Sequence, residues 1–133
     1  MTANEKIQKA LDGASACLEN SIVELGKKND ESFADSVWHV GAELEYALFL
    51  FSMKFPDESS VSKRKPNPEL KDIETATILT ECKKLLDEAK RQMAKEKLAE
   101  SYKTVNMARH YVLKVQEDIA KKKREAFKQK EKA

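Results

Sequence analysis

Apolar residues recur at steps of three and four along most of the chain, which is the spacing that keeps side chains on one face of an α-helix. Near the N-terminus this stripe comprises Ile7, Leu11, Ala14, Leu18, Ile22 and Leu25. Residues 2–5, TANE, have the S/T-x-x-E form of a capping box. Gly26 and the two lysines after it are typical of a helix end at which glycine is left-handed. The pattern predicts a first helix over residues 3–27.

Residues 31–55 carry two apolar stripes, and both have helical spacing. The first predicts a face that packs into the core: Phe33, Val37, Val40, Leu44, Leu48, Phe51 and Phe55. The second is rotated from the first and comprises Trp38, Ala42, Phe49 and Met53. Asp30 is the expected N-cap, and Pro56 ends this second helix. Because one four-helix core need not cover both stripes, we expect the helix either to lie centrally or to form a dimer interface.

The second half of the chain predicts a loop and two further helices. Residues 56–68, PDESSVSKRKPNP, combine Pro and Ser with one large apolar residue and predict a long exposed loop. A third helix is expected over residues 69–97, with these positions inward: Leu70, Ile73, Thr77, Leu79, Cys82, Leu86, Ala89 and Met93. The stripe then slips in phase, which favours a turn near residues 97–101 with Ser101 as N-cap and a fourth helix over 101–124. One long kinked helix is the alternative.

Together these elements predict an all-α fold, a single antiparallel up-down four-helix bundle over residues 1–133 with its first and third helices parallel. Only three glycines and three prolines occur, which disfavours a fold of many strands and turns. Residues 125–133 are expected to form a frayed basic tail. No apolar run is long enough for a membrane span and no secretory signal is visible, so we expect a cytoplasmic protein that does not enter a membrane.

The two cysteines lie too far apart in the sequence for a CxxC redox pair or a zinc knuckle. We interpret Cys17 and Cys82 as reduced thiols that fill the core, because free cysteine is among the most buried residue types. A disulfide is the alternative, since parallel first and third helices would place both residues in one layer.

The net charge of +2 hides an asymmetry between the two halves of the chain. Residues 1–60 carry 5 basic and 11 acidic side chains, a net −6, whereas residues 61–133 carry 20 and 12, a net +8. The halves could dock against each other, or the basic half could face an anionic partner such as a nucleic acid. The residues that would contact a nucleic acid are Lys63, Arg64, Lys65, Arg109, His110, Lys121, Lys122, Lys123 and Arg124.

Candidate chemistry is sparse, because the chain has only two histidines and no Gly-rich phosphate loop. The best metal candidate is Asp35, His39 and Glu43, spaced four apart on the second predicted helix. Three ligands that drift around one helix do not enclose a metal, so a solvated polar seam is the simpler interpretation. We expect no catalytic residues, no cofactor and no bound metal, and the absence of a catalytic set favours a protein that is not an enzyme.

Two segments, which together cover most of the chain, resemble a known family. The stretch from Ile7 to Phe55, which includes GKKNDESFADSVWHVGAELEYALFLFSMKF, is similar to the first helical hairpin of HEPN-type bundles. In those bundles an aromatic-His pair is followed by a Glu and an Ala/Leu run, and the matching residues here are Trp38, His39, Glu43, Ala47 and Leu48. The segment LAESYKTVNMARHYVLKVQEDI resembles the family's last helix. The chain is also similar to uncharacterised small helical-bundle proteins of archaea.

The resemblance implies a dimer that acts as a toxin, a ribonuclease or a nucleotide-binding partner. The ribonucleases of the family use an Arg followed a few residues later by a His. Here Arg109 directly precedes His110 and no Arg precedes His39, which removes the main reason to expect nuclease activity. We therefore expect a non-enzymatic interaction module that binds a protein partner and itself. The alternative is a nucleotide- or RNA-binding protein, of toxin–antitoxin type or a weak nuclease.

Overall fold

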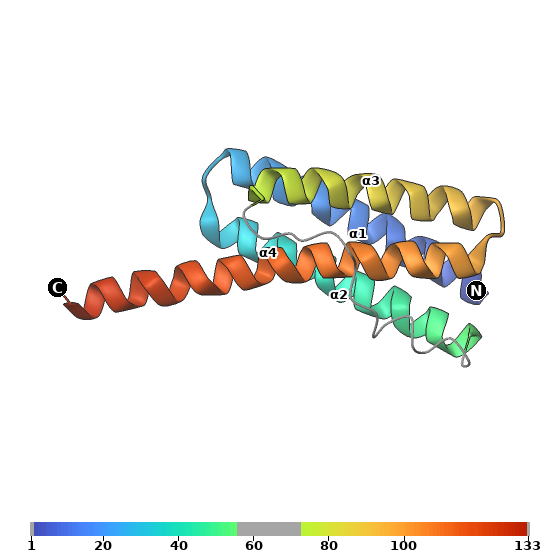
Figure 1. The fold of residues 1–133 in the computed structure, drawn as a ribbon. Coiled ribbons are helices and arrows are strands. Elements are labelled where there is room, and N and C mark those ends of the chain that lie inside the picture. Colours follow the sequence, from blue (N-terminus) through green and yellow to red (C-terminus); the bar gives the residue numbers. More distant parts are fainter. Residues whose placement is uncertain (1, 56–72, 133) are drawn as a thin grey trace.

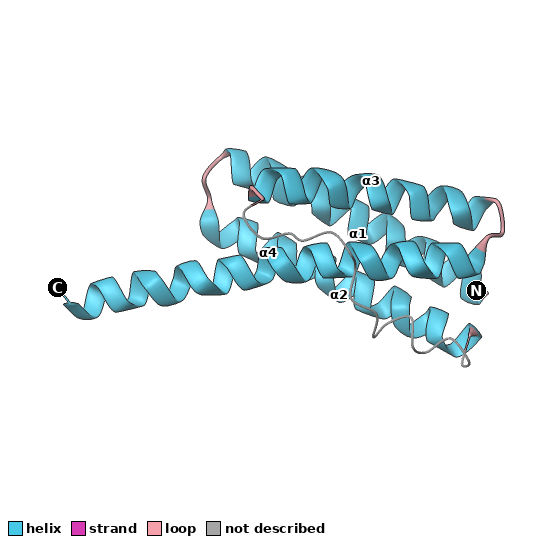
Figure 2. Cartoon of the chain, in the orientation of Figure 1, coloured by secondary structure: helices cyan, strands magenta, loops and turns pink. Residues whose placement is uncertain are grey.

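The computed structural model describes residues 2–55 and 73–132 and contains four helices (Figure 1). They are α1 (Ala3–Gly26), α2 (Asp30–Lys54), α3 (Thr75–Ala94) and α4 (Leu98–Lys132). Within these two ranges only helices and short turns occur, so the predicted all-α four-helix fold is confirmed (Figure 2). The loop predicted over 56–68, the Lys63-Arg64-Lys65 cluster and the first residues of the predicted third helix lie outside the described residues.

Each helix packs against two neighbours, in the cyclic order α1, α2, α4, α3. Ion pairs fix the direction of α3 relative to α1. Lys83 lies 3.3 Å from Glu19, and Lys90 lies 3.6 Å from Asp12. From the first ion pair to the second, the residue number rises along α3 and falls along α1. These two helices therefore run antiparallel, as Figure 1 also shows.

The prediction that α1 and α3 are parallel is therefore wrong, and so is the simple up-down order. α2 ends beside the start of α1, where Lys54 donates a hydrogen bond to Asn4. α3 begins beside the end of α1, where Thr75 and Leu25 line one groove. The 17 residues between Phe55 and Ile73 can span about 56 Å when extended, whereas α2 is only about 37 Å long. The sequence segment is thus long enough to connect opposite ends of the bundle, and α2 and α3 run in the same direction.

The core lies between the four helices and is lined by the first stripe of α2, as predicted. Its fully buried members include Val37, Val40, Leu44 and Phe51 of α2, with Leu11 and Leu18 of α1, Ile78, Leu79 and Leu86 of α3, and Tyr102 and Val105 of α4. The Tyr102 ring stacks on Phe51 and Phe55, with centroid separations of 5.2 and 6.2 Å. Two inward positions of the predicted third helix are wrong: Ile73, which precedes α3, and Thr77 are exposed, because Ile78 and Leu79 take the inner face at this end.

The turn between α1 and α2 differs from its prediction in two residues. No glycine in the described ranges has a positive φ, and the left-handed residue is Lys28, with φ 59°. Its N–H donates to Leu25 O and the N–H of Asn29 donates to Glu24 O, which is the Schellman pattern of a helix end. The N-cap of α2 is Asn29, not Asp30, since the Asn29 side chain accepts from the Ser32 N–H.

The turn between α3 and α4 repeats this geometry, with Glu96 left-handed at φ 60°. It lies at residues 95–97, a few residues before the predicted position, so α3 and α4 are separate helices. Ser101 is not an N-cap: it is buried within α4, and its hydroxyl donates to the Ala89 carbonyl of α3 at 2.9 Å. The phase slip of the apolar stripe correctly predicted a boundary between two helices. The sequence alone does not distinguish an N-cap serine from a buried serine that bonds to a neighbouring helix.

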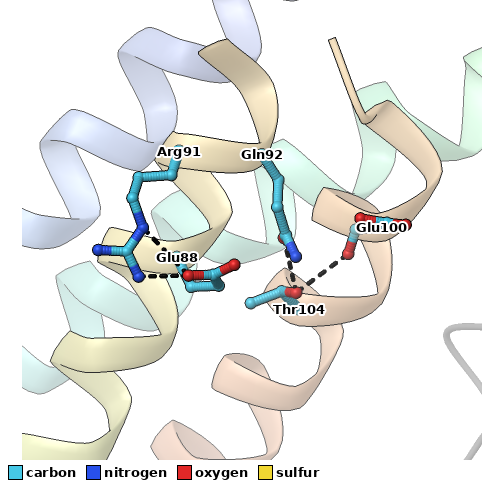
Figure 3. Close-up of polar contacts among 5 residues, drawn as sticks. All are labelled: Glu88, Arg91, Gln92, Glu100 and Thr104. Carbon is cyan, nitrogen blue, oxygen red and sulfur yellow. Dashed lines mark hydrogen bonds and ion pairs between the residues drawn. The ribbon is translucent and has the colours of Figure 1, made fainter. Parts of the chain in front are cut away.

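Polar contacts on the outer surface join α3 to α4 near this turn (Figure 3). The Thr104 hydroxyl lies 2.8 Å from Gln92 Oε1 and 3.0 Å from the Glu100 carbonyl, so its single proton is shared between these two acceptors. Nearby, Arg91 forms an ion pair with Glu88, and its hydrogen bond and charge lower the pKa of the Glu88 carboxyl. The Thr104–Gln92 bond joins α4 to α3 and the Arg91–Glu88 pair lies within α3, so these groups serve the fold rather than a site.

The two cysteines are free thiols in different surroundings. Cys82 is buried, as predicted, and its thiol donates to the Ala108 carbonyl at 3.7 Å. Burial raises the pKa of this thiol from 9.0 to about 12. Cys17 is only half-buried, and burial together with the charge of Glu43 raises the pKa of its thiol. The argument that placed both cysteines in one layer rested on parallel helices and no longer holds.

The basic tail is helical to Lys132, so the prediction that it frays after residue 124 is wrong. Residues 121–132 contain no Gly, Pro or β-branched residue, and Lys, Glu, Ala and Gln are good helix formers. This part of α4 extends beyond the other three helices (Figure 1). None of the helices in the described ranges is both long and apolar enough to cross a membrane.

Candidate interaction surface

The outer face of α2 exposes large apolar side chains in one continuous row. Trp38 is 66% exposed, Phe49 59% and Met53 65%, and Ala42 between them is also exposed. Tyr46, 47% exposed, completes the row at the same helical spacing. We call these five residues the α2 stripe: Trp38, Ala42, Tyr46, Phe49 and Met53. The sequence prediction named four of them and missed Tyr46, although its position four residues after Ala42 was a usable signal.

The stripe is exposed because of how the neighbours of α2 are arranged. At 100° per residue, the five stripe positions span about 80° of the helix circumference, on the side opposite Leu44 and Val37. α1 and α4 pack against the two flanks of α2, and α3 lies across the bundle from it. No described element therefore covers the outward side of α2. The first apolar stripe of the helix faces the core, and the α2 stripe faces solvent.

A shallow groove of about 240 Å³ runs beside the stripe, between α2 and α4. Its lining comprises Trp38, Gly41, Ala42 and Glu45 of α2, with Arg109, Val112, Leu113 and Gln116 of α4. Small residues at positions 41 and 42 form the floor on the α2 side. A Cβ on Gly41 would lie 2.6 Å from Nε2 of Gln116, so the glycine lets the two helices approach closely. The groove thus gives the surface a hollow next to its exposed rings.

Arg109 and His110, which the nucleic-acid prediction paired, point to different places. Arg109 crosses to α2 and forms an ion pair with Glu45, with its side chain mostly buried. The Nδ1–H of His110 donates to the Asn106 carbonyl one turn earlier on α4, at 2.9 Å. Adjacent helix positions point about 100° apart, which is why the two side chains diverge. The structure therefore does not bring them together in one site, and Arg109 instead belongs to the edge of the α2 stripe.

The three metal-ligand candidates on α2 do not gather either. Asp35 and His39 are exposed. The Glu43 carboxylate packs over α1, close enough that a Cβ on Gly13 would lie 3.2 Å from its Cδ. In residues 2–55 and 73–132, no three His, Cys, Asp or Glu side chains are placed where they could hold a metal ion.

The remaining basic candidates, Lys121, Lys122, Lys123 and Arg124, are all exposed in the last third of α4, and Lys122 and Lys123 line open grooves beside the start of α2. Phe127, one turn further on, is also exposed. These cations lie at the far end of α4 from Tyr102 and do not converge with Arg109 on one pocket. They form an exposed helical surface, not an enclosed site.

Comparisons of this chain with protein-family models, with curated proteins and with solved structures found no match.

Proposed function

We propose that this protein is a non-enzymatic interaction module that binds a protein partner, including a second copy of itself, through the α2 stripe. The support is a single observation, the continuous exposed row of Trp38, Ala42, Tyr46, Phe49 and Met53 on a helix whose other side is already buried. Aromatic residues and Met are enriched at protein interfaces, and Trp and Tyr are among the residues that most often dominate the binding energy.

The size of the row argues that it has a partner. Whole aromatic side chains contribute about 150–250 Å² each, so the exposed parts of the three rings and Met53 amount to on the order of 450 Å². The largest apolar patch on a typical monomer measures about 300–600 Å² and is often functional, so a row of this size is the natural candidate for an interaction site. Burying such an area would contribute on the order of 10 kcal/mol before the costs of association.

The test uses Trp38, the only tryptophan of the chain, as a built-in reporter. Sedimentation equilibrium should show a dimer at micromolar concentration. Over the same concentration range, the Trp38 emission maximum should move to shorter wavelength and acrylamide quenching should fall, because the ring leaves water. A monomer with concentration-independent emission would contradict self-association.

A second candidate, RNA binding, is favoured by four consecutive exposed cations at positions 121–124, which point to different sides of a helix that extends past the bundle. Such a helix can place its cations against a phosphate backbone, and each contact adds salt-dependent affinity. The scarcity of aromatic side chains that could stack on bases argues against RNA binding, since only the exposed ring of Phe127 lies near these cations.

Fluorescence anisotropy with a labelled single-stranded RNA tests this candidate at 50 and 200 mM salt. Binding through the four cations should weaken steeply with salt, with a logarithmic slope of about −0.7 per phosphate contacted. Replacing residues 121–124 with Gln should abolish that slope. The matched control replaces four exposed lysines elsewhere, Lys6, Lys9, Lys27 and Lys84, and should retain it. Absence of binding, or equal loss in both variants, would contradict the candidate.

A further inference from the structure

We infer that two copies associate with their α2 helices antiparallel, about a two-fold axis that passes between positions 45 and 46. This inference rests on the proposed self-association and adds the partner's orientation and the residues that meet. It follows from the order of large and small side chains along the α2 stripe, and from the groove and ion pair beside it.

The stripe matches itself when its direction is reversed. A two-fold axis between positions 45 and 46 places Trp38 opposite the second copy's Met53, and Ala42 opposite its Phe49. The smallest member of the stripe thus faces a large ring. Ala42 also borders the groove with Gly41 and Leu113, so the second copy's Phe49 enters a hollow that is already present.

A parallel arrangement would lack this match. It would set Phe49 against Phe49 and Trp38 against Trp38, and leave Ala42 facing Ala42 beside an unfilled groove. Well-packed interfaces avoid such voids, because each void forfeits contacts. Both arrangements are two-fold symmetric, with one patch bound to its own copy, so the pairing of large with small side chains is what separates them.

The available area is that of a modest dimer. A standard-size interface buries about 800 Å² on each partner. The stripe supplies on the order of 450 Å² of apolar surface per copy. Leu113 and the rim side chains Glu45 and Gln116 extend it across the groove. An interface of this composition suits association at micromolar concentration, which leaves a monomer accessible for measurement.

Charge near the axis is balanced within each copy. The axis brings the two Glu45 carboxylates near each other on the α4 side of the stripe, and the two Tyr46 rings near each other on the α1 side. Two bare carboxylates would repel, but each Glu45 is already paired with Arg109 of its own chain. The result is a neutral cluster of four charges at the centre of the dimer.

Cysteine cross-linking of the full chain tests the orientation, in a Cys17→Ala background that leaves only the buried Cys82 as a native thiol. Tyr46→Cys and Glu45→Cys both place a thiol next to its own symmetry mate. Asp35→Cys lies on the same exposed face, but in an antiparallel dimer it is about 30 Å from its copy along the helix axis. A disulfide requires Cα atoms within about 7 Å.

The expected result is that Tyr46→Cys and Glu45→Cys form covalent dimers at least about tenfold faster than Asp35→Cys, because only the first two meet this distance limit. Fast cross-linking of Asp35→Cys, with a wild-type dimer in sedimentation, would show a parallel pair and overturn the orientation while the proposed function stands. A sedimenting dimer in which all three variants cross-link slowly would place the interface elsewhere and overturn the inference. A wild-type monomer would instead contradict the proposed self-association itself.

Discussion

The two faces of α2 carry the same kinds of side chain in opposite surroundings. The inner face buries Leu44 and Phe51 completely, while the outer face leaves Trp38 and Phe49 more than half exposed. Both rows have helical spacing, so neither local propensity nor periodicity distinguishes them. The difference comes from the neighbours: α1 and α4 pack against α2 and α3 lies across the core from its inner face, whereas no described element covers the outer face.

This contrast separates two ways in which an apolar row can be buried from water, by folding and by association. The inner row gains its free energy when the chain folds, so it contributes to the stability of the monomer. The outer row can gain the same kind of free energy only when a second molecule covers it. Substitutions on the two faces should therefore change different equilibria, and the predictions below test that separation.

The largest effect is expected from Leu44→Ala on the inner face, because the substitution leaves a cavity in a well-packed core. It should lower the free energy of unfolding by about 2–5 kcal/mol. Urea denaturation followed by circular dichroism measures this, at a concentration below that of association, since dimerisation would stabilise the folded state. A loss below about 1 kcal/mol would show that the inner face of α2 is less tightly packed than its burial indicates.

On the outer face, Phe49→Glu should act on association and not on folding. The substitution removes the burial of a ring, about 1.5–3 kcal/mol, and introduces a charge, so dimerisation should weaken at least about 100-fold in sedimentation equilibrium. The free energy of unfolding of the monomer should change by no more than about 0.5 kcal/mol.

The matched control for this substitution is Val23→Glu, at an apolar side chain of α1 that is 51% exposed and lies off the stripe. It should leave both association and unfolding unchanged, within about 0.5 kcal/mol. Equal weakening by Phe49→Glu and Val23→Glu would mean that any exposed apolar residue contributes to association, and the contrast between the two faces of α2 would fail.

A smaller effect concerns the buried Cys82, whose thiol has its pKa raised from 9.0 to about 12 by burial. The folded state keeps its proton at a pH where the unfolded chain loses it, so stability should fall as pH rises through this window. Between pH 9 and pH 10 the loss from this thiol should be about 1 kcal/mol. It is measured as the difference in pH dependence between the wild type and Cys82→Ala, which lacks the thiol. Identical pH dependence in the two proteins would contradict the prediction.

Much of this arrangement could be predicted from sequence, for reasons that particular residues make clear. The rotated positions of Trp38, Ala42, Phe49 and Met53 follow from the helical period alone, and their exposure agrees with it. The turn residues were harder, because Lys28 and Glu96 take a left-handed conformation that glycine usually occupies. The sequence pattern instead predicted the left-handed residue at Gly26, two residues before Lys28.

The periodicity of apolar residues could not predict the directions of the helices or the contacts between residues far apart in the sequence. The direction of α3 depends on which end of the bundle its first residues reach, and a stripe of apolar residues is the same in either direction. The partnership of Glu45 with Arg109 joins residues 64 positions apart, and nothing in the local sequence marks it. Whether the α2 stripe binds a partner stays a prediction, because it concerns a second molecule.

The smallest effect, and the one that probes the centre of the proposed dimer, is expected from Arg109→Gln. Removing the guanidinium leaves two Glu45 carboxylates facing each other near the axis, so association should weaken by about twofold to tenfold, in keeping with the strength of partly exposed ion pairs. Higher salt screens that repulsion, so the dimer of Arg109→Gln should tighten with salt while the wild-type dimer changes little. The double variant Glu45→Gln, Arg109→Gln removes both charges and should recover association. If the double variant associates no better than Arg109→Gln, the loss reflects the packing of Arg109 between α2 and α4, and the two carboxylates do not meet.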